Sequence, residues 1–245
     1  MDIERAIEVF VRGFSATRSY THPFMASRIG GAWVMRDEPA RIRDSRAEEY
    51  VGHAVSPEAL DQMARRTARG RYFICAIRAI DEKDIAIRGE FKALGYRLMA
   101  TEPLFVHDLV HHPEVECGYP VERIEDWSQA QILAKAAGRR QILERHLCES
   151  PLTVRQYAAM DGVDPIGWVR SIRVDNAAYC SNLFVQERYR RKGIGRALIA
   201  RMLADDRQFG LESNVLLASH TGAHLYRNLG YHQIGELLMF VRRKN

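Results

Sequence analysis

The chain has 245 residues, a net charge of +5, a pI near 9.1 and 47% hydrophobic residues. This length allows one large domain or two of about 120 residues, and the composition excludes disordered and fibrous proteins. No run of 18 apolar residues predicts a membrane span, and residues 1–5 lack the layout of a secretory signal. We therefore expect a cytoplasmic protein without a membrane partner. Its four widely spaced cysteines, with no C-x-x-C, favour free thiols.

The first half of the chain alternates helix and strand patterns. Helices are predicted in residues 2–24, where Ile3, Ile7 and Phe14 recur near the helical period, from Ala59 to Ala68 and from Asp81 to Leu94; strands are predicted at residues 30–35, 48–54, 72–77, 96–99 and 104–109. Ser56-Pro57 is a typical helix start. Pro113, Gly118 and Pro120 mark a domain boundary, so the predicted domains are residues 1–112 and 119–245.

The second half continues the same alternation. Helices are predicted from Asp126 onward, from Gln141 to Cys148, from Gly195 to about Asp206 and from Gly222 to Leu229; strands are predicted from Val121 to Ile124, Thr153 to Met160, Ile166 to Val174, Tyr179 to Val185 and Val215 to Ala218, with a last strand pair at residues 231–242. Asp161-Gly162 favours a hairpin turn between two of these strands.

The stretch from Arg190 to Arg196, R-R-K-G-I-G-R, joins a predicted strand to a predicted helix. Two glycines spaced two apart let the backbone turn and bring its N–H groups close to a ligand. The following helix N-terminus adds a favourable partial positive charge. The stretch therefore predicts a site for a phosphate-bearing ligand, and it also explains much of the positive charge without a nucleic-acid partner.

A weak internal repeat relates the two halves. Leu94-Gly95-Tyr96 and Phe105-Val106 match Leu229-Gly230-Tyr231 and Phe240-Val241 at one common offset. In this register Tyr226 corresponds to Phe91, and the glycine loop has no counterpart near Pro57. We expect the first copy to lack the phosphate loop and the hydroxyl, with Phe91 in a packing role.

The second half resembles the GNAT superfamily of acyl-CoA-dependent N-acyltransferases. R-x-x-G-x-G is present as Arg190, Gly193 and Gly195, and L-Y-x-x-x-G-Y as Leu225, Tyr226, Gly230 and Tyr231, in the family's order and spacing over roughly residues 119–245. The resemblance implies an α/β fold of tandem GNAT-like domains, with mixed, mostly antiparallel sheets flanked by helices. The first domain would be a degenerate copy.

The resemblance also implies a cosubstrate, acetyl-CoA, and the residues that hold it. The cofactor-binding residues would be Leu183, Phe184, Val185, Arg190, Arg191, Lys192, Gly193, Ile194, Gly195, Arg196 and Ser219. The pantetheine arm would pair with the strand ending at Val185, as an added strand pairs with a free edge. Tyr226 would be the catalytic residue, protonating the departing thiolate.

Two positions depart from the family pattern. Family members with a glutamate base carry it where this chain has Tyr179, and Ser219 stands where many have an asparagine. No general base is therefore inherited, and His220, His224 and Glu149 remain alternatives. The expected reaction transfers an acetyl group from acetyl-CoA to a primary amine of a small molecule or peptide.

The alternative to this enzyme is a non-catalytic acyl-CoA-binding or regulatory module. No metal site is expected, because His107, His111, His112 and Cys117 match no zinc spacing. The three tryptophans favour packing over substrate stacking. The sequence leaves a homodimer open.

Overall fold

The computed structural model describes residues 1–41, 43–111 and 113–243, and the chain divides into two compact units. The first comprises Met1–Phe105, Leu217–His224 and Gln233–Asn245, and the second Val106–Leu216 and Leu225–His232. The units are interleaved in the sequence, whereas the predicted domains 1–112 and 119–245 are consecutive. It stays a prediction that residues 1–112 are a degenerate copy of the second domain.

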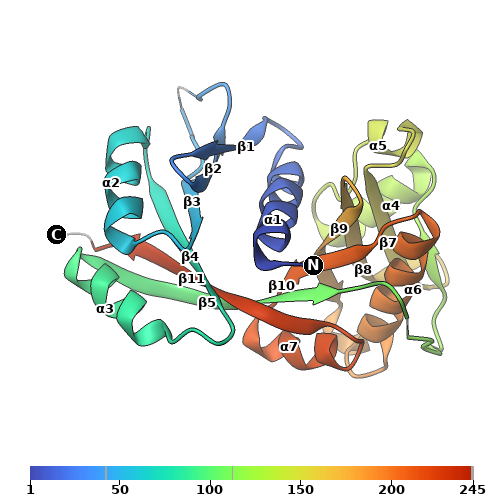
Figure 1. Cartoon of the computed structure of the whole chain (residues 1–245). Helices are drawn as coiled ribbons and strands as arrows, with labels where there is room; N and C mark the ends of the chain where they lie inside the picture. The colour runs from blue at the N-terminus through green and yellow to red at the C-terminus, as the bar shows by residue number, and fades with distance from the viewer. Residues whose placement is uncertain (42, 112, 244–245) are drawn as a thin grey trace. The chain divides into compact units, whose positions relative to one another are not determined.

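The first unit contains a mixed sheet with the strand order β1-β2-β3-β4-β11-β5 (Figure 1). Its strands are β1 (Phe24–Ile29), β2 (Ala32–Asp37), β3 (Glu48–His53), β4 (Tyr72–Ala79), β5 (Tyr96–His107) and β11 (His232–Arg242). β3 and β4 run parallel, while the β1–β2, β2–β3 and β4–β11 pairs are antiparallel. A strand from the C-terminal end of the chain thus lies inside the sheet of the first unit.

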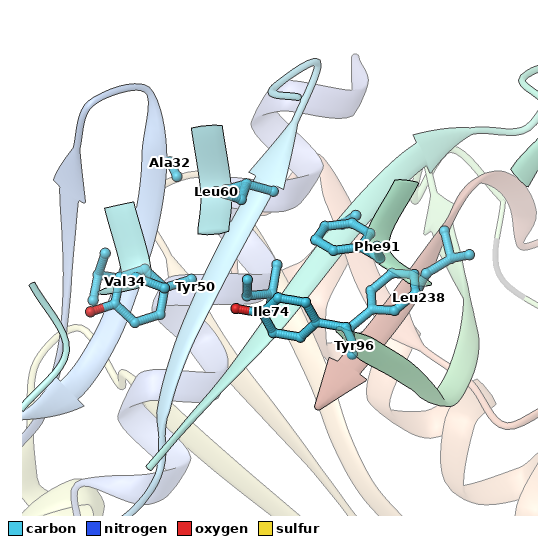
Figure 2. Packing of buried hydrophobic residues seen from close by; sticks show 11 residues of the cluster. Ala32, Val34, Tyr50, Leu60, Ile74, Phe91, Tyr96 and Leu238 are labelled. Carbon is cyan, nitrogen blue, oxygen red and sulfur yellow. The ribbon is translucent and has the colours of Figure 1, made fainter. Parts of the chain in front are cut away.

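Three helices accompany this sheet: α1 (Ile3–Arg18), α2 (Pro57–Thr67) and α3 (Asp84–Ala93). Ser56 caps α2, since its side chain accepts the N–H of Ala59. Figure 2 shows the buried cluster to which α2, α3 and five of the strands contribute, including Leu60, Phe91 and Leu238. Phe91 is fully buried and stacks on Phe240 at 4.1 Å between ring centroids, which confirms its packing role.

The second unit contains a mixed sheet with the order β10-β9-β8-β7-β6. Its elements are β6 (Val121–Arg123), α4 (Trp127–Ala137), α5 (Arg145–Cys148), β7 (Val154–Asp161), β8 (Asp164–Val174), β9 (Ala177–Val185), η1 (Glu187–Tyr189), α6 (Ile194–Gln208) and β10 (Ser213–Leu217). The helix α7 (His220–Arg227) is divided, because residues 220–224 belong to the first unit and the rest to the second. Only the β9–β10 pair is parallel among these neighbours. The predicted fold class, a mixed and mostly antiparallel sheet flanked by helices, is confirmed.

Some predicted elements were wrong in extent. The helix predicted from Gln141 begins only at Arg145, because the side chain of Gln141 turns inward to bind Asn182 and Arg170. The two strands predicted at residues 96–99 and 104–109 form the continuous β5, since the carbonyl of Pro103 accepts the N–H of Ala218 at 3.0 Å and pairing continues. The pair predicted at 231–242 is the single strand β11, and β1 was not predicted.

Candidate active site

Strand β9 has an open edge toward β10. The two strands pair only from Ser213–Ala177 to Val215–Tyr179, while β9 stays paired with β8 as far as Val185. The register between β8 and β9 shifts near Asn182, which adopts a left-handed backbone with φ +58°. This bulge bends β9 away from its neighbour. The edge from residue 180 to residue 185 is therefore available to an extended ligand.

The corresponding strand pair of the first unit is closed. β3 and β4 are also parallel neighbours, and they pair at every position from Glu48–Tyr72 to His53–Ile77. The Cβ of an alanine at position 52 would lie 2.8 Å from a methyl carbon of Leu60, so α2 packs tightly on β3. The open edge is thus a property of the second unit.

The loop from Arg190 to Arg196 follows β9 and leads directly into α6. Gly193 caps α6 in a left-handed conformation with φ +79°, and Arg191 has φ +64°. Among the described residues, the backbone N–H groups of residues 191–196 donate no hydrogen bond, and the first helical bond is that of Ala197 to Gly193 at 3.0 Å. These free donors at a helix N-terminus form a site suited to an anion.

The side chains around the loop fix its position. Arg190 Nε donates to the carbonyl of Val185 at 3.1 Å, which ties the loop to the end of β9. Lys192 Nζ lies 5.1 Å from the ring centroid of Tyr189, whose hydroxyl donates to Asp161 at 2.7 Å. Ile194 is 1% exposed. It can therefore serve a ligand only through its backbone, whereas Arg191, Lys192 and Arg196 are exposed cations.

Gly195 lies close to the end of β9 and to Leu225, near the C-terminal end of α7. A Cβ at this position would lie 3.9 Å from Val185 Cγ2 and 3.7 Å from Leu225 Cδ2, both ordinary contact distances. The three predicted regions, the end of β9, the glycine loop and the helix that carries Tyr226, therefore meet at this point.

Tyr226 is buried on α7, with 9% of its surface exposed. Its ring meets the ring of Tyr231 edge to face at 5.6 Å. Burial raises the pKa of Tyr226, and the nearby thiol of Cys180 on β9 adds to the shift. The phenol therefore stays protonated across the physiological pH range, as a proton donor must.

Phe184 and Val185 point to opposite faces of β9, as neighbours in a strand do. Val185 lies on the side of α6, beside Gly195. Phe184 is 39% exposed and stacks on Trp168 with ring centroids 4.6 Å apart. Leu183, between Phe184 and the bulge, is half-buried. Only the backbone of these residues lies along the open edge.

Other predicted positions have local partners. Ser219 precedes α7, and its Oγ accepts the N–H of Gly222 at 3.2 Å. His220 Nε2 lies 2.6 Å from Thr101 Oγ1, and Glu149 accepts a hydrogen bond from Thr153. Tyr179, at the position of the family's glutamate, is 6% exposed. The general base thus stays unassigned.

Sequence reasoning missed a buried polar chain behind the site. Tyr231 donates its hydroxyl hydrogen to Asn214, and Asn214 Nδ2 donates to Asp206, both at 2.7 Å. Asp206 also accepts from Arg155 at 2.6 Å, and both of these side chains are 0% exposed. Burial raises the pKa of Asp206, and Arg155 opposes the shift. No spacing in the sequence relates these residues, because they come from β7, α6 and β10.

Within residues 1–41, 43–111 and 113–243, no group of three or more His, Cys, Asp or Glu side chains could hold a metal ion. His112 lies outside the described residues. His107, one of the histidines considered, instead accepts the N–H of Leu109 at 3.0 Å and contacts the ring of Tyr231. None of the described helices is long and apolar enough to cross a membrane.

Comparison with known families identifies one domain. Residues 154–233 match the family model described as acetyltransferase (GNAT) domain. The matched range runs from β7 to the first residues of β11 and includes the open edge, the glycine loop and Tyr226. The resemblance noted from the motifs is thereby confirmed for this range, and it supports acyl transfer in general. A search among curated proteins finds no match.

Solved structures match nearly the whole chain. A GCN5-related N-acetyltransferase from Kribbella flavida is 14% identical, with 98% of this chain and 96% of that chain covered and a TM-score of 0.64. A GNAT-family putative acetyltransferase from Novosphingobium aromaticivorans is 14% identical, with 98% and 99% covered and a TM-score of 0.56. A tandem GNAT protein from the clavulanic acid biosynthesis pathway is 13% identical, with 98% and 95% covered and a TM-score of 0.56. At these identities the likenesses show the fold alone.

Proposed function

We propose that the GNAT domain at residues 154–233 transfers an acetyl group from acetyl-CoA to a primary amine. The observation that carries this proposal is the meeting of the open β9 edge, the unpaired N–H groups of residues 191–196 and the helix of Tyr226 around Gly195. Each of these three features is suited to interact with one part of an acyl-CoA thioester.

The residues fit the cosubstrate part by part. The free N–H groups at the start of α6, with Arg191, Lys192 and Arg196 around them, suit the pyrophosphate. The open edge from residue 180 to residue 185 suits the amide groups of the pantetheine arm, which can pair with it as a strand would. Gly195 lies beside Val185 and Leu225, so the start of α6 is next to the end of this edge.

In the reaction, a neutral amine attacks the thioester carbonyl carbon, the C–N bond forms and the C–S bond breaks. A backbone N–H near Val185 would stabilise the negative charge that develops on the carbonyl oxygen. The sulfur leaves as a thiolate, and Tyr226 donates a hydrogen bond or its proton to it. Because burial raises the pKa of Tyr226, a full proton transfer to the thiolate, whose conjugate thiol has a pKa of about 8.5, is uphill. Hydrogen bonding to the developing charge is therefore its main contribution.

The amine must lose a proton, and no carboxylate stands at the position of Tyr179 to accept it. This observation favours a second candidate function, acyl-CoA binding without turnover. In the enzyme, the proton would leave through water to His220, His224 or Glu149.

The test is thiol release from acetyl-CoA across a panel of amines, combined with calorimetric titration of CoA. We expect CoA to bind, and at least one amine to be acetylated with one thiol released per product. Binding without any amine-dependent thiol release would favour the second candidate. Absence of CoA binding would contradict both.

A further inference from the structure

A cavity of about 340 Å³ lies on the other face of β9 from the glycine loop. Its walls include Arg139, Trp168, Asn182, Phe184 and Gln186. Gly167 shows which face this is: a Cβ there would lie 3.3 Å from Ile194 and Leu198 of α6, so the next residue, Trp168, points away from α6. The volume lies in the range of small-ligand pockets.

The cavity adjoins the open edge of the strand. Asn182, which bends β9 at the bulge, and Phe184 are both lining residues and both lie within the unpaired stretch. A molecule in the cavity therefore reaches the edge from the face opposite to the phosphate loop. This is the side from which an acceptor could approach a thioester carbonyl held along β9.

The bulge also positions the single charged residue of the cavity wall. Arg139 NH2 donates to Asn182 Oδ1 at 3.1 Å, and Asn182 Nδ2 in turn donates to Gln141 Oε1 at 2.5 Å. Gln141 is 1% exposed and also accepts from Arg170 at 3.1 Å. Gln141 thus fixes the side chain of Asn182, which accepts a hydrogen bond from one of the five N–H groups of Arg139. The other donors of the guanidinium can bind a carboxylate.

Two aromatic side chains form part of the remaining wall, which also includes Gln186. Phe184 presents 39% of its surface, and Trp168 supports it from beneath in a stacked arrangement. Such a pair offers area for an apolar or aromatic group of a ligand. Arg139 is the only charged side chain among the described residues that line the cavity, so the cavity disfavours polyamines and lysine-rich peptides, because like charges repel.

We propose that this cavity is the acceptor pocket and that the acceptor is a small primary amine carrying a carboxylate and an apolar side group. Arg139 binds the carboxylate, the Phe184–Trp168 pair holds the apolar group, and the amine points to the edge of β9. This inference rests on the proposed function, whose acceptor it specifies.

The experiment compares L-phenylalanine with phenethylamine, which lacks the carboxylate, as acceptors at saturating acetyl-CoA. We expect a KM for L-phenylalanine at least about tenfold lower. Arg139→Met should raise that KM by about tenfold or more with little change in kcat, and should leave the KM for phenethylamine within about twofold. Arg139→Lys should restore part of the difference, and Arg140→Met, on the exposed neighbouring residue, is the matched control.

Equal KM values for the two amines in the unmodified protein, or equal effects of Arg139→Met on both, would overturn the inference and leave the acetyltransferase intact. A loss of acetyl-CoA affinity in Arg139→Met would assign the cavity to the cosubstrate instead. If no amine is acetylated, the proposed function fails separately.

In that case ligand binding to the cavity is measured directly. The fluorescence of Trp168 is followed in the full-length Trp33→Phe/Trp127→Phe variant, in which Trp168 is the remaining tryptophan. Saturable quenching by L-phenylalanine that Arg139→Met abolishes supports the pocket, and no quenching, or equal quenching by both amines, refutes it.

Discussion

The ring of Tyr226 meets the ring of Tyr231 edge to face, with centroids 5.6 Å apart and planes at 74°. Phe91 meets Tyr96 in the same way, at 5.8 Å and 79°. The two pairs stand at corresponding positions of the internal repeat, each spanning the end of a helix and the residue that follows its glycine. The hydroxyl of Tyr226 is therefore the atom that distinguishes these pairs, and the proposed reaction gives it a chemical role.

Replacing Tyr226 with phenylalanine should lower kcat by about 100-fold, because the developing thiolate loses its hydrogen-bond donor. The affinity for CoA should stay within about threefold. Since burial raises the pKa of Tyr226, the unmodified protein should show no loss of kcat from ionisation of this phenol as the pH rises to about 9. Stopped-flow and steady-state assays check both points, with Tyr72→Phe in the first unit as the control. An unchanged kcat in Tyr226→Phe would contradict the assignment.

The two glycines of the loop should respond differently to alanine. Gly195→Ala adds a methyl group at ordinary contact distance from Val185 and Leu225, so the protein should fold and bind CoA more weakly. Gly193→Ala forces a side chain into φ +79° and should cost about 1 kcal/mol of stability.

Gly195→Glu should abolish CoA binding, because it would add a bulky negative charge at the start of α6, beside the N–H groups proposed to bind the pyrophosphate. Calorimetric titration of CoA and urea unfolding measure these effects. Retained CoA affinity in Gly195→Glu would remove the loop from the site.

The buried Arg155–Asp206 pair should be necessary for folding of the second unit. Arg155→Met leaves the carboxylate of Asp206 buried without its cation, so the free energy of unfolding should fall by about 3–5 kcal/mol. Arg201→Met breaks a pair in which the Arg201 side chain is 47% exposed and Asp205 is buried but also lies 3.8 Å from Arg123, so it should cost less than about 1 kcal/mol. Equal losses in the two variants, measured by urea denaturation, would contradict this difference in burial.

Glu49 should make the first unit less stable as the pH rises. Burial raises its pKa to about 7, Glu102 adds to the shift, and Arg18, 3.2 Å away, opposes it. The folded state thus holds a proton that the unfolded chain releases above about pH 4.5. The stabilisation is complete below that pH and is lost as the pH rises to about 7, a change on the order of 3 kcal/mol.

Glu49→Gln should flatten this decline, whereas Glu38→Gln, on an exposed side chain, should not. Urea denaturation at about pH 5 and about pH 8 provides the comparison. Parallel pH profiles in Glu49→Gln and the unmodified protein would refute the prediction.

Local signals were sufficient to predict most elements of the fold. Ser56-Pro57 starts α2, and the strand, glycine loop and helix around Gly193 follow in the predicted order. The predicted hairpin joins β7 to β8, with its turn at residues 162–163, one residue later than Asp161-Gly162. These features depend on backbone preferences of a few consecutive residues. The Gln141 helix was wrong because a tertiary contact, the buried amide network around Asn182, outweighs helical periodicity there.

The candidate site could be predicted only where its residues lie in motifs. The glycine loop and Tyr226 carry spacing that the sequence displays, whereas the bulge at Asn182 and the cavity wall at Arg139 arise from pairing between distant strands and a loop. Asparagine is enriched in the left-handed region, but a single asparagine within a strand pattern does not by itself locate a bulge. Register shifts of this kind appear only once the strands are placed side by side.

The position of β11 bears on how the protein is synthesised. Leu238 and Phe240 belong to the buried cluster of the first unit, yet a ribosome adds them after every residue that the cluster takes from α2, α3 and β2 to β5. During synthesis the sheet of the first unit therefore lacks β11, the strand between β4 and β5, until the strands of the second unit have been made. In nascent chains stopped at residue 232, the first unit should therefore stay incompletely folded and be bound by chaperones or cleaved by proteases. The glycine loop is already present in these chains.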